Sequence, residues 1–166
     1  MPFTPFHFGP GAVLHAVAPR QVSFLAFCAS NVLTDIEPLY YMLTGQYPVH
    51  RFLHTALGAT VTWVATLLLF LAVLRVAAPL RLPNWFGWRN LLPMQVALGA
   101  ALGTYSHLVL DGFMHADMTP FAPFSKANPL LGGISLRLLY SACIAAGLIG
   151  LVVIGIRKWK ARGVER

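Results

Sequence analysis

The chain has 166 residues, a length that suits one compact unit, and 57% of them are hydrophobic whereas only 10% are charged. Soluble domains carry roughly 25% charged residues, so this composition argues against an ordinary water-soluble domain and indicates a membrane protein. The net charge of +7 does not indicate nucleic-acid binding, because the basic residues gather in one connection and in the C-terminal tail and form no basic face interleaved with aromatic residues.

The first third of the chain allows two arrangements. Its apolar stretch at residues 20–34 is about 15 residues long, fewer than the ~20 that a simple transmembrane helix needs. It predicts either a tilted or broken span, or a re-entrant hairpin of two short helices that meet near Pro19. The hairpin places His7 on the membrane face that holds Asp35, whereas a span places them on opposite faces. Several prolines and the lack of a basic residue before position 20 also lead us to expect no cleaved signal peptide.

Three later segments, at residues 55–78, 91–113 and 133–156, are apolar and long enough to cross roughly 30 Å of hydrocarbon as helices. The second contains a Gly-x-x-x-Gly spacing that permits close helix packing. Together with the N-terminal span or hairpin, these segments predict an all-α fold, a polytopic helical membrane protein in which residues 1–166 form a single membrane-embedded domain. Basic residues lie between the first two segments and in the tail at residues 157–166, so the positive-inside rule makes both cytoplasmic.

Acidic residues and histidines are concentrated near the expected outer ends of these helices. Ionisable groups at membrane depth are costly, and they mark a functional site by default. The same groups could also serve only as structural links between helices. Four of the five acidic residues and four of the six histidines belong to this concentration, namely Asp35, Glu37, Asp111, Asp117, His50, His54, His107 and His115.

The spacing of the histidines predicts ligand pairs on helices. The segment HRFLH at residues 50–54 separates His50 and His54 by four positions, which places two imidazoles on one helical face where both can reach a metal ion. His107 and Asp111 have the same spacing, and His115 extends that stripe by a further turn if the helix persists. Imidazole and carboxylate ligands without thiolate suit zinc, manganese or iron, and zinc is the metal expected for hydrolysis.

The segment DIEP adds two more carboxylates at an expected helix end. Pro38 disfavours a helical conformation at the residue before it, so we expect the helix to stop here. Asp35 is a further candidate metal ligand. Glu37 and Asp117 are candidate catalytic bases, because a carboxylate that does not bind the metal can take a proton from activated water.

Other polar side chains have less specific interpretations. Arg51 and Arg137 either balance nearby carboxylates or bind a substrate phosphate through two hydrogen bonds. His15 has no acidic residue near it in the sequence, so we expect it to be structural. Cys28 and Cys143 lie in apolar runs without a Cys-x-x-Cys spacing and are expected to be buried hydrophobic residues.

The order of these motifs resembles the bacterial family of predicted membrane-bound metal-dependent hydrolases that includes the LexA-regulated, YdjM-like inner-membrane proteins. The resemblance runs from His7 through the DIEP and HRFLHT segments to the HLVLD helix and the following Thr119 and Pro120. It implies that His7 belongs to the metal site, that the protein lies in the bacterial inner membrane, and that it hydrolyses a substrate. The site would then face the extracytoplasmic side.

The sequence thus favours a membrane-embedded metal-dependent hydrolase that acts through activated water on a phosphoester of a lipid or lipid-linked substrate. The alternative is a non-catalytic metal-binding membrane protein, such as a structural site, a sensor or a transport-associated module. Neither hypothesis involves nucleic acid. The expected ligands of the metal are His7, Asp35, His50, His54, His107, Asp111 and His115.

Overall fold

The regular secondary structure of the described residues consists of helices alone. A computed structural model describes residues 5–77 and 79–164, in which helices form and no strand does, so the predicted all-α fold is confirmed. Short 3-10 helices cover Pro5–His7 (η1), Phe52–His54 (η2) and Trp85–Asn90 (η3). The α-helices are α1 (Phe8–Val17), α2 (Phe24–Leu43), α3 (Ala56–Ala77), α4 (Pro93–Met114) and α5 (Leu136–Val164).

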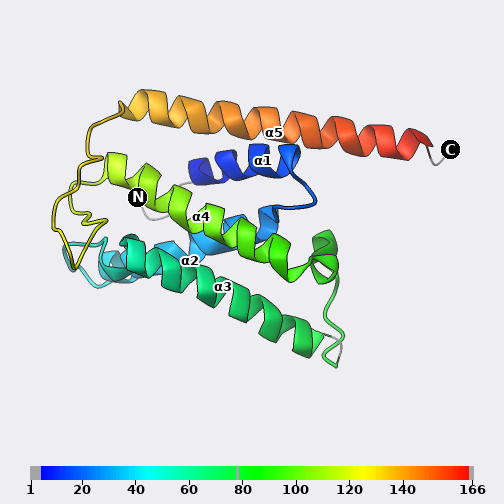
Figure 1. The fold of residues 1–166 in the computed structure, drawn as a ribbon, viewed down its shortest axis with the longest axis horizontal. Coiled ribbons are helices and arrows are strands. Elements are labelled where there is room, and N and C mark those ends of the chain that lie inside the picture. The colour runs from blue at the N-terminus through cyan, green and yellow to red at the C-terminus, as the bar shows by residue number, and fades with distance from the viewer. Residues whose placement is uncertain (1–4, 78, 165–166) are drawn as a thin grey trace.

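Helix α4 lies in the middle of the bundle and packs against α2 and α3, while α1 packs against α5 along the opposite side (Figure 1). The loops at residues 44–55 and 115–135 gather at one end of the bundle. The connection between α3 and α4 lies at the other end, as does the C-terminal end of α5. The chain segments that carry most of the candidate ligands therefore meet at a single end of the molecule.

The N-terminal third adopts the hairpin, one of its two expected arrangements. Helices α1 and α2 pack against each other, and the chain reverses between Ala18 and Ser23. Ser23 caps α2, because its hydroxyl oxygen accepts a hydrogen bond from the backbone N–H of Ala26. The reversal returns His7 to the end of the bundle that holds Asp35.

The prediction that Pro38 ends its helix is wrong. Helix α2 continues to Leu43 with Pro38 inside it. Proline lacks an N–H group and so removes one helical hydrogen bond, but Pro38 is fully buried, and this packing outweighs the local preference. Asp35 and Glu37 consequently project from a continuous helix.

Among the described residues, two helices are long and apolar enough to cross a membrane, at Ala56–Ala77 and Leu136–Arg157, with mean hydropathies of 2.2 and 2.4. Only 22% and 17% of their apolar windows are buried, so most of their hydrophobic surface is exposed. Helix α4 has the length of the third predicted span but is not in this set, because glycine, threonine, histidine and aspartate interrupt its apolar sequence. Helix α5 continues through the predicted tail to Val164, and residues 165–166 lie outside the described part.

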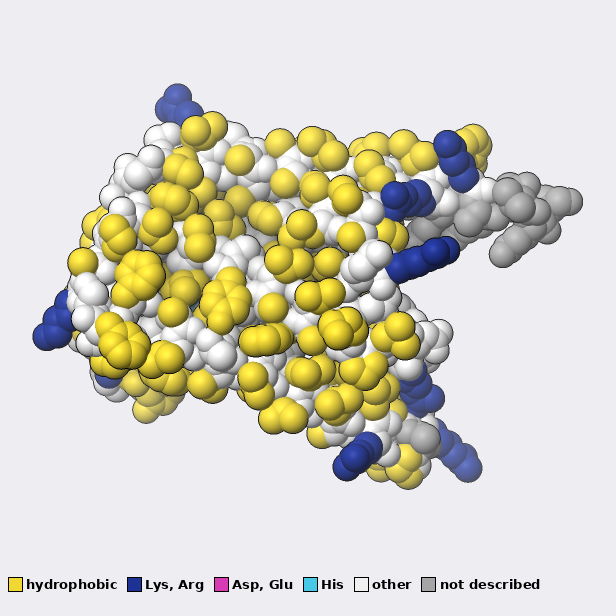
Figure 2. Space-filling view, in the orientation of Figure 1, with side chains coloured by type: hydrophobic (Ala, Val, Ile, Leu, Met, Phe, Trp, Pro, Cys, Tyr) yellow, Lys and Arg dark blue, Asp and Glu magenta, His cyan; other side chains and the backbone are white. Residues whose placement is uncertain are grey.

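The exposed surface has two distinct regions. Figure 2 shows hydrophobic side chains covering most of the face in view, including the length of α3 and α5. Lys and Arg side chains gather mainly at the end where α3 and α5 finish, opposite the loops at residues 44–55 and 115–135. Soluble monomers rarely expose apolar patches of this extent, and such patches mark contact with a membrane or a partner.

Glycines allow α4 to approach α2 closely. A Cβ atom added at Gly103 would contact the Ser30 hydroxyl and would lie 2.6 Å from the Phe27 carbonyl oxygen. A Cβ atom at Gly99 would contact the Ser23 backbone in the same way. The Gly-x-x-x-Gly spacing therefore faces the partner helix, as close packing requires.

Gly103→Leu should lower the free energy of unfolding by about 3 kcal/mol, because the new side chain forces α2 and α4 apart. The midpoint of denaturant unfolding in detergent measures this loss. Gly155→Ala in α5 is the matched control, because an added Cβ there meets no atom within 4 Å. Equal midpoints for the two variants would contradict the packing described above.

Candidate metal centre

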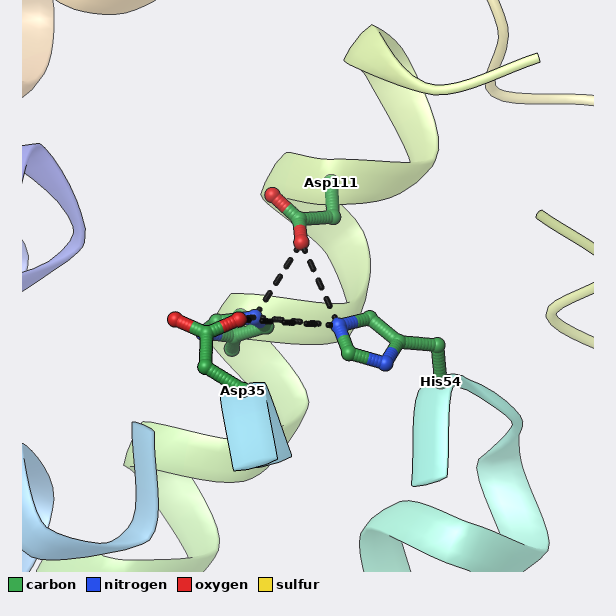
Figure 3. Close-up of side chains that lie close together, drawn as sticks. Asp35, His54 and Asp111 are labelled. Carbon is green, nitrogen blue, oxygen red and sulfur yellow. Dashed lines mark hydrogen bonds and ion pairs between the residues drawn. The ribbon is translucent and has the colours of Figure 1, made fainter. Parts of the chain in front are cut away.

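Four buried side chains converge at the loop end of the bundle. Asp35 comes from α2, His54 from η2, and His107 and Asp111 from α4. Each offers one ligand atom, and these atoms all lie within 4.8 Å of one another. Figure 3 shows the side chains of Asp35, His54 and Asp111 directed toward a common point. The group could therefore hold a metal ion, and we call it the four-ligand group.

The distances within the four-ligand group fit a single ion. His107 Nε2 lies 3.2 Å from Asp35 Oδ1 and 3.1 Å from Asp111 Oδ2. His54 Nε2 lies 3.3 Å from His107 Nε2, 3.4 Å from Asp111 Oδ2 and 3.9 Å from Asp35 Oδ1. Ligands placed tetrahedrally around an ion, with bonds of about 2.0–2.2 Å, are about 3.3–3.6 Å apart. The observed separations therefore need little adjustment to coordinate one ion.

Protons or a metal ion must lie between these atoms for them to be so close together. Carboxylate oxygens and imidazole nitrogens with free lone pairs repel one another, and burial removes the water that would screen them. His54 and His107 are both 0% exposed. Only protons or a metal ion can hold such a group together.

A hydrogen bond at Nδ1 fixes the orientation of His107. The Asn31 side-chain oxygen accepts it at 2.9 Å, and the Asn31 amide nitrogen donates to the Phe27 carbonyl at 2.8 Å. This second bond fixes the amide so that its oxygen faces the imidazole, which leaves Nε2 free to bind a metal. Asn31 was not predicted as part of the site, although an amide within an apolar run, four positions before Asp35, was a usable signal.

The prediction that His50 and His54 share a helical face is wrong. His54 ends η2, and His50 lies before it in a segment without helical structure. Glu37 explains the difference, because its carboxylate captures three backbone N–H groups and holds the segment as an irregular turn. Those N–H groups, at 3.2, 3.0 and 2.8 Å, belong to Arg51, Phe52 and Leu53.

The second oxygen of Asp111 faces a different set of histidines. Asp111 Oδ1 lies 3.2 Å from His7 Nε2 and 3.8 Å from His115 Nε2. His115 follows the last residue of α4, and one of its nitrogens lies within 4.8 Å of ligand atoms of Asp111 and His50. The other six expected ligands thus lie around the carboxylate of the seventh, Asp111.

Asp117 orients His50. Its Oδ1 accepts a hydrogen bond from His50 Nδ1 at 2.9 Å, and its Oδ2 accepts from the backbone N–H groups of Val49 and His50 at 3.0 and 3.2 Å. Burial opposes the charge on Asp117, but the hydrogen bonds from His50 lower the pKa of the carboxyl below its usual value. Burial and the neighbouring His54 lower the pKa of His50, against the effect of Asp117. A neutral imidazole is the form that binds metals.

An open groove of about 500 Å³ adjoins the centre at His50 and Asp117. Arg51 also lines it, with its guanidinium carbon 3.6 Å from the centre of the Tyr41 ring and its Nε donating to the Pro48 carbonyl. Most of the groove surface is apolar. The other expected arginine, Arg137, is exposed in the first turn of α5. Of the two arginines, the structure places Arg51 beside the centre.

Comparisons with known proteins identify no relative. The chain matches no protein-family model, no curated protein and no solved structure. The family resemblance drawn from the order of motifs therefore stays a prediction. The four-ligand group and its hydrogen-bonded neighbours are the features of the chain that indicate a function.

Proposed function

We propose that the chain is a membrane-embedded metal-dependent hydrolase whose ion is held by Asp35, His54, His107 and Asp111. The observation that carries this proposal is the convergence of four buried ligand atoms from three separate segments of the chain. Two imidazoles and two carboxylates without thiolate suit zinc, with manganese and iron as alternatives. The resemblance in motif order to predicted membrane-bound hydrolases supports the same reaction class.

In this proposal α3, α4 and α5 cross the bacterial inner membrane. The exposed apolar surfaces of α3 and α5 support the proposal, and α4 lies between them with a length of 22 residues, or about 33 Å at helical rise. Helices α1 and α2 enter the membrane as a re-entrant hairpin. The basic end of the bundle is cytoplasmic by the positive-inside rule, so the metal centre faces the extracytoplasmic side.

The proposed reaction is hydrolysis of a phosphoester in a lipid or lipid-linked substrate. Water forms a bond to phosphorus, the ester P–O bond breaks, and the leaving oxygen gains a proton. A bound divalent ion would supply a Lewis acid and lower the pKa of water toward neutrality. The apolar groove beside His50 suits a hydrocarbon chain, and Arg51 at its edge can donate two hydrogen bonds to a phosphate. Arg137 is the second candidate for phosphate binding.

Glu37 and Asp117 have positioning roles in this proposal. Both were expected to act as bases, but each carboxylate already accepts hydrogen bonds from backbone N–H groups. Glu37 shapes the turn that carries His54, and Asp117 orients His50. Supporting contacts of this kind commonly change metal affinity by 10–100-fold when removed.

Metal analysis combined with hydrolysis assays tests the proposed function. We expect the purified protein to contain stoichiometric metal and to hydrolyse a member of a panel of phospholipids and polyprenyl phosphates. His54→Ala should lose the ion of the four-ligand group and, with it, the activity. His15→Ala is the matched control, because His15 lies outside the centre and its Nδ1 donates to the Val22 carbonyl at 2.7 Å.

Two outcomes of this experiment would contradict the proposal. Absence of stoichiometric metal in the unmodified protein would remove the basis for any metal-dependent activity. Stoichiometric metal with turnover no greater than that of His54→Ala would favour the non-catalytic alternative, a structural, sensing or transport-associated metal site.

A further inference from the structure

The two oxygens of Asp111 serve two separate groups of imidazoles. Oδ2 lies 3.1 Å from His107 Nε2 and 3.4 Å from His54 Nε2, within the four-ligand group. Oδ1 lies 3.2 Å from His7 Nε2 and 3.8 Å from His115 Nε2. A carboxylate that presents one oxygen to each of two ligand sets has the geometry of a bridge between two metal ions.

Among the described residues, the atoms on the second side of this bridge have no hydrogen-bond partner. His7 is 2% exposed, and both of its ring nitrogens are buried without a partner in the described part of the chain. The same is true of Asp111 Oδ1. Although 3.2 Å separates His7 Nε2 from this oxygen, the two atoms lack the geometry of a hydrogen bond. Buried polar atoms in folded proteins normally have partners, so this group calls for a ligand that both atoms can contact.

Two further imidazoles lie near Asp111, because His50 and His115 each offer a ligand atom within 4.8 Å of the other and of the Asp111 carboxylate. The rings of His50 and His115 lie 4.2 Å apart between centroids. Because Asp117 binds His50 at Nδ1, Nε2 is the nitrogen of that ring available to an ion. The side chain of His115 is 23% exposed, so this side of the centre opens toward solvent while the four-ligand group is buried.

Two divalent ions would balance the charges around the centre. Four carboxylates gather here, those of Asp35, Glu37, Asp111 and Asp117. Every ion pair between described side chains joins one of these carboxylates to a histidine, and none involves Lys or Arg. With neutral histidines, the four negative charges are neutralised by two divalent cations but not by one.

We propose that the centre is binuclear, with Asp111 bridging the ion of the four-ligand group and a second divalent ion bound by His7, His50 and His115. This inference rests on the proposed function for the first ion. Two-metal hydrolytic sites hold their ions about 3.5–4 Å apart, a separation that one bridging carboxylate can span. The pair clamps the attacking and leaving oxygens of a phosphoester, which makes a phosphate ester the substrate class that such a centre fits.

Counting bound zinc per chain is the decisive experiment. The full-length protein, loaded with Zn²⁺ and freed of excess by dialysis, should contain two ions per chain. One ion per chain would overturn the binuclear centre and leave the proposed function intact. No ion would overturn both, so the two failures are distinguishable.

Variants of the second ligand set assign the second ion. His115→Ala and His7→Gln should each reduce the count from two ions to one, and the retained ion reports that the four-ligand group is still folded. His15→Ala should retain two. Two ions in both ligand variants would contradict the assignment of the second ion. A variant without any ion would contradict it too, because the four-ligand group is unchanged in both variants.

Spectroscopy of the Co²⁺-loaded protein adds a readout independent of activity. Two ions bridged by Asp111 are magnetically coupled, so the electron paramagnetic resonance signal per ion should increase in His115→Ala, where one isolated ion remains. The same signal per ion in the unmodified protein and in His115→Ala would show that no bridge exists and would overturn the proposal.

Discussion

Asp111→Ala should leave the protein without stoichiometric metal and without hydrolytic turnover. The variant removes the one carboxylate that contacts both ligand sets, with His107 and His54 on one oxygen and His7 and His115 on the other. Loss of a supporting residue around a metal commonly costs 10–100-fold in affinity, so loss of a shared ligand should exceed about 100-fold. Titration of the metal-free protein with zinc measures the change.

Two controls separate the role of the charge from that of the fold. Asp111→Asn keeps the shape of the side chain and removes its charge, and we expect it to bind metal more tightly than Asp111→Ala but far more weakly than the unmodified protein. His15→Ala should bind as the unmodified protein does. Stoichiometric zinc in purified Asp111→Ala would contradict the central position of this carboxylate.

Glu37→Ala should destabilise the protein and weaken metal binding together. The Glu37 carboxylate accepts hydrogen bonds from three consecutive N–H groups of the turn that leads to His54. Hydrogen bonds to a charged group contribute about 1.5–3 kcal/mol each when shielded, but two of these are only partly buried and the one from Phe52 is exposed. We therefore expect a loss of about 3 kcal/mol in unfolding free energy and a 10–100-fold loss in zinc affinity.

Denaturant unfolding with and without chelator distinguishes the two effects of Glu37→Ala. The loss of stability should persist in the metal-free protein, because the hydrogen bonds do not depend on an ion. Glu37→Gln keeps one acceptor oxygen, so its free energy of unfolding should lie between those of the unmodified protein and Glu37→Ala. Thr44→Ala is a control at the same end of α2, since its exposed hydroxyl only donates to nearby backbone carbonyls and accepts from the Gln46 side chain. A metal-free Glu37→Ala protein as stable as Thr44→Ala would contradict this role.

Most residues of the candidate centre could be predicted from the composition of the chain and from the ligand chemistry of histidine and carboxylate. The expected ligands came from a concentration of histidine and carboxylate in an otherwise apolar chain, and the structure brings the other six around Asp111. The helical spacing of His107 and Asp111 was sufficient because both lie within one regular helix. The all-helical fold followed from the long apolar segments.

Predictions that depended on local rules failed where distant residues intervene. His50 and His54 have helical spacing, but Glu37 binds the intervening backbone and prevents a helix. Pro38 disfavours helix locally, yet tertiary burial carries α2 past it. Neither effect is visible in a short window of sequence, because the deciding partner lies in another segment or in the packed interior.

The packing of α5 on α1 makes the second ligand set depend on the last of the described helices. His7 precedes α1, and α1 packs on α5, with Gly9 and Gly150 at points of close backbone approach. Ligands from α2, η2 and α4 are all synthesised before α5, so the four-ligand group can assemble first. The second ligand set acquires its support only when α5 docks. In the binuclear proposal, the more solvent-open ion is therefore bound last.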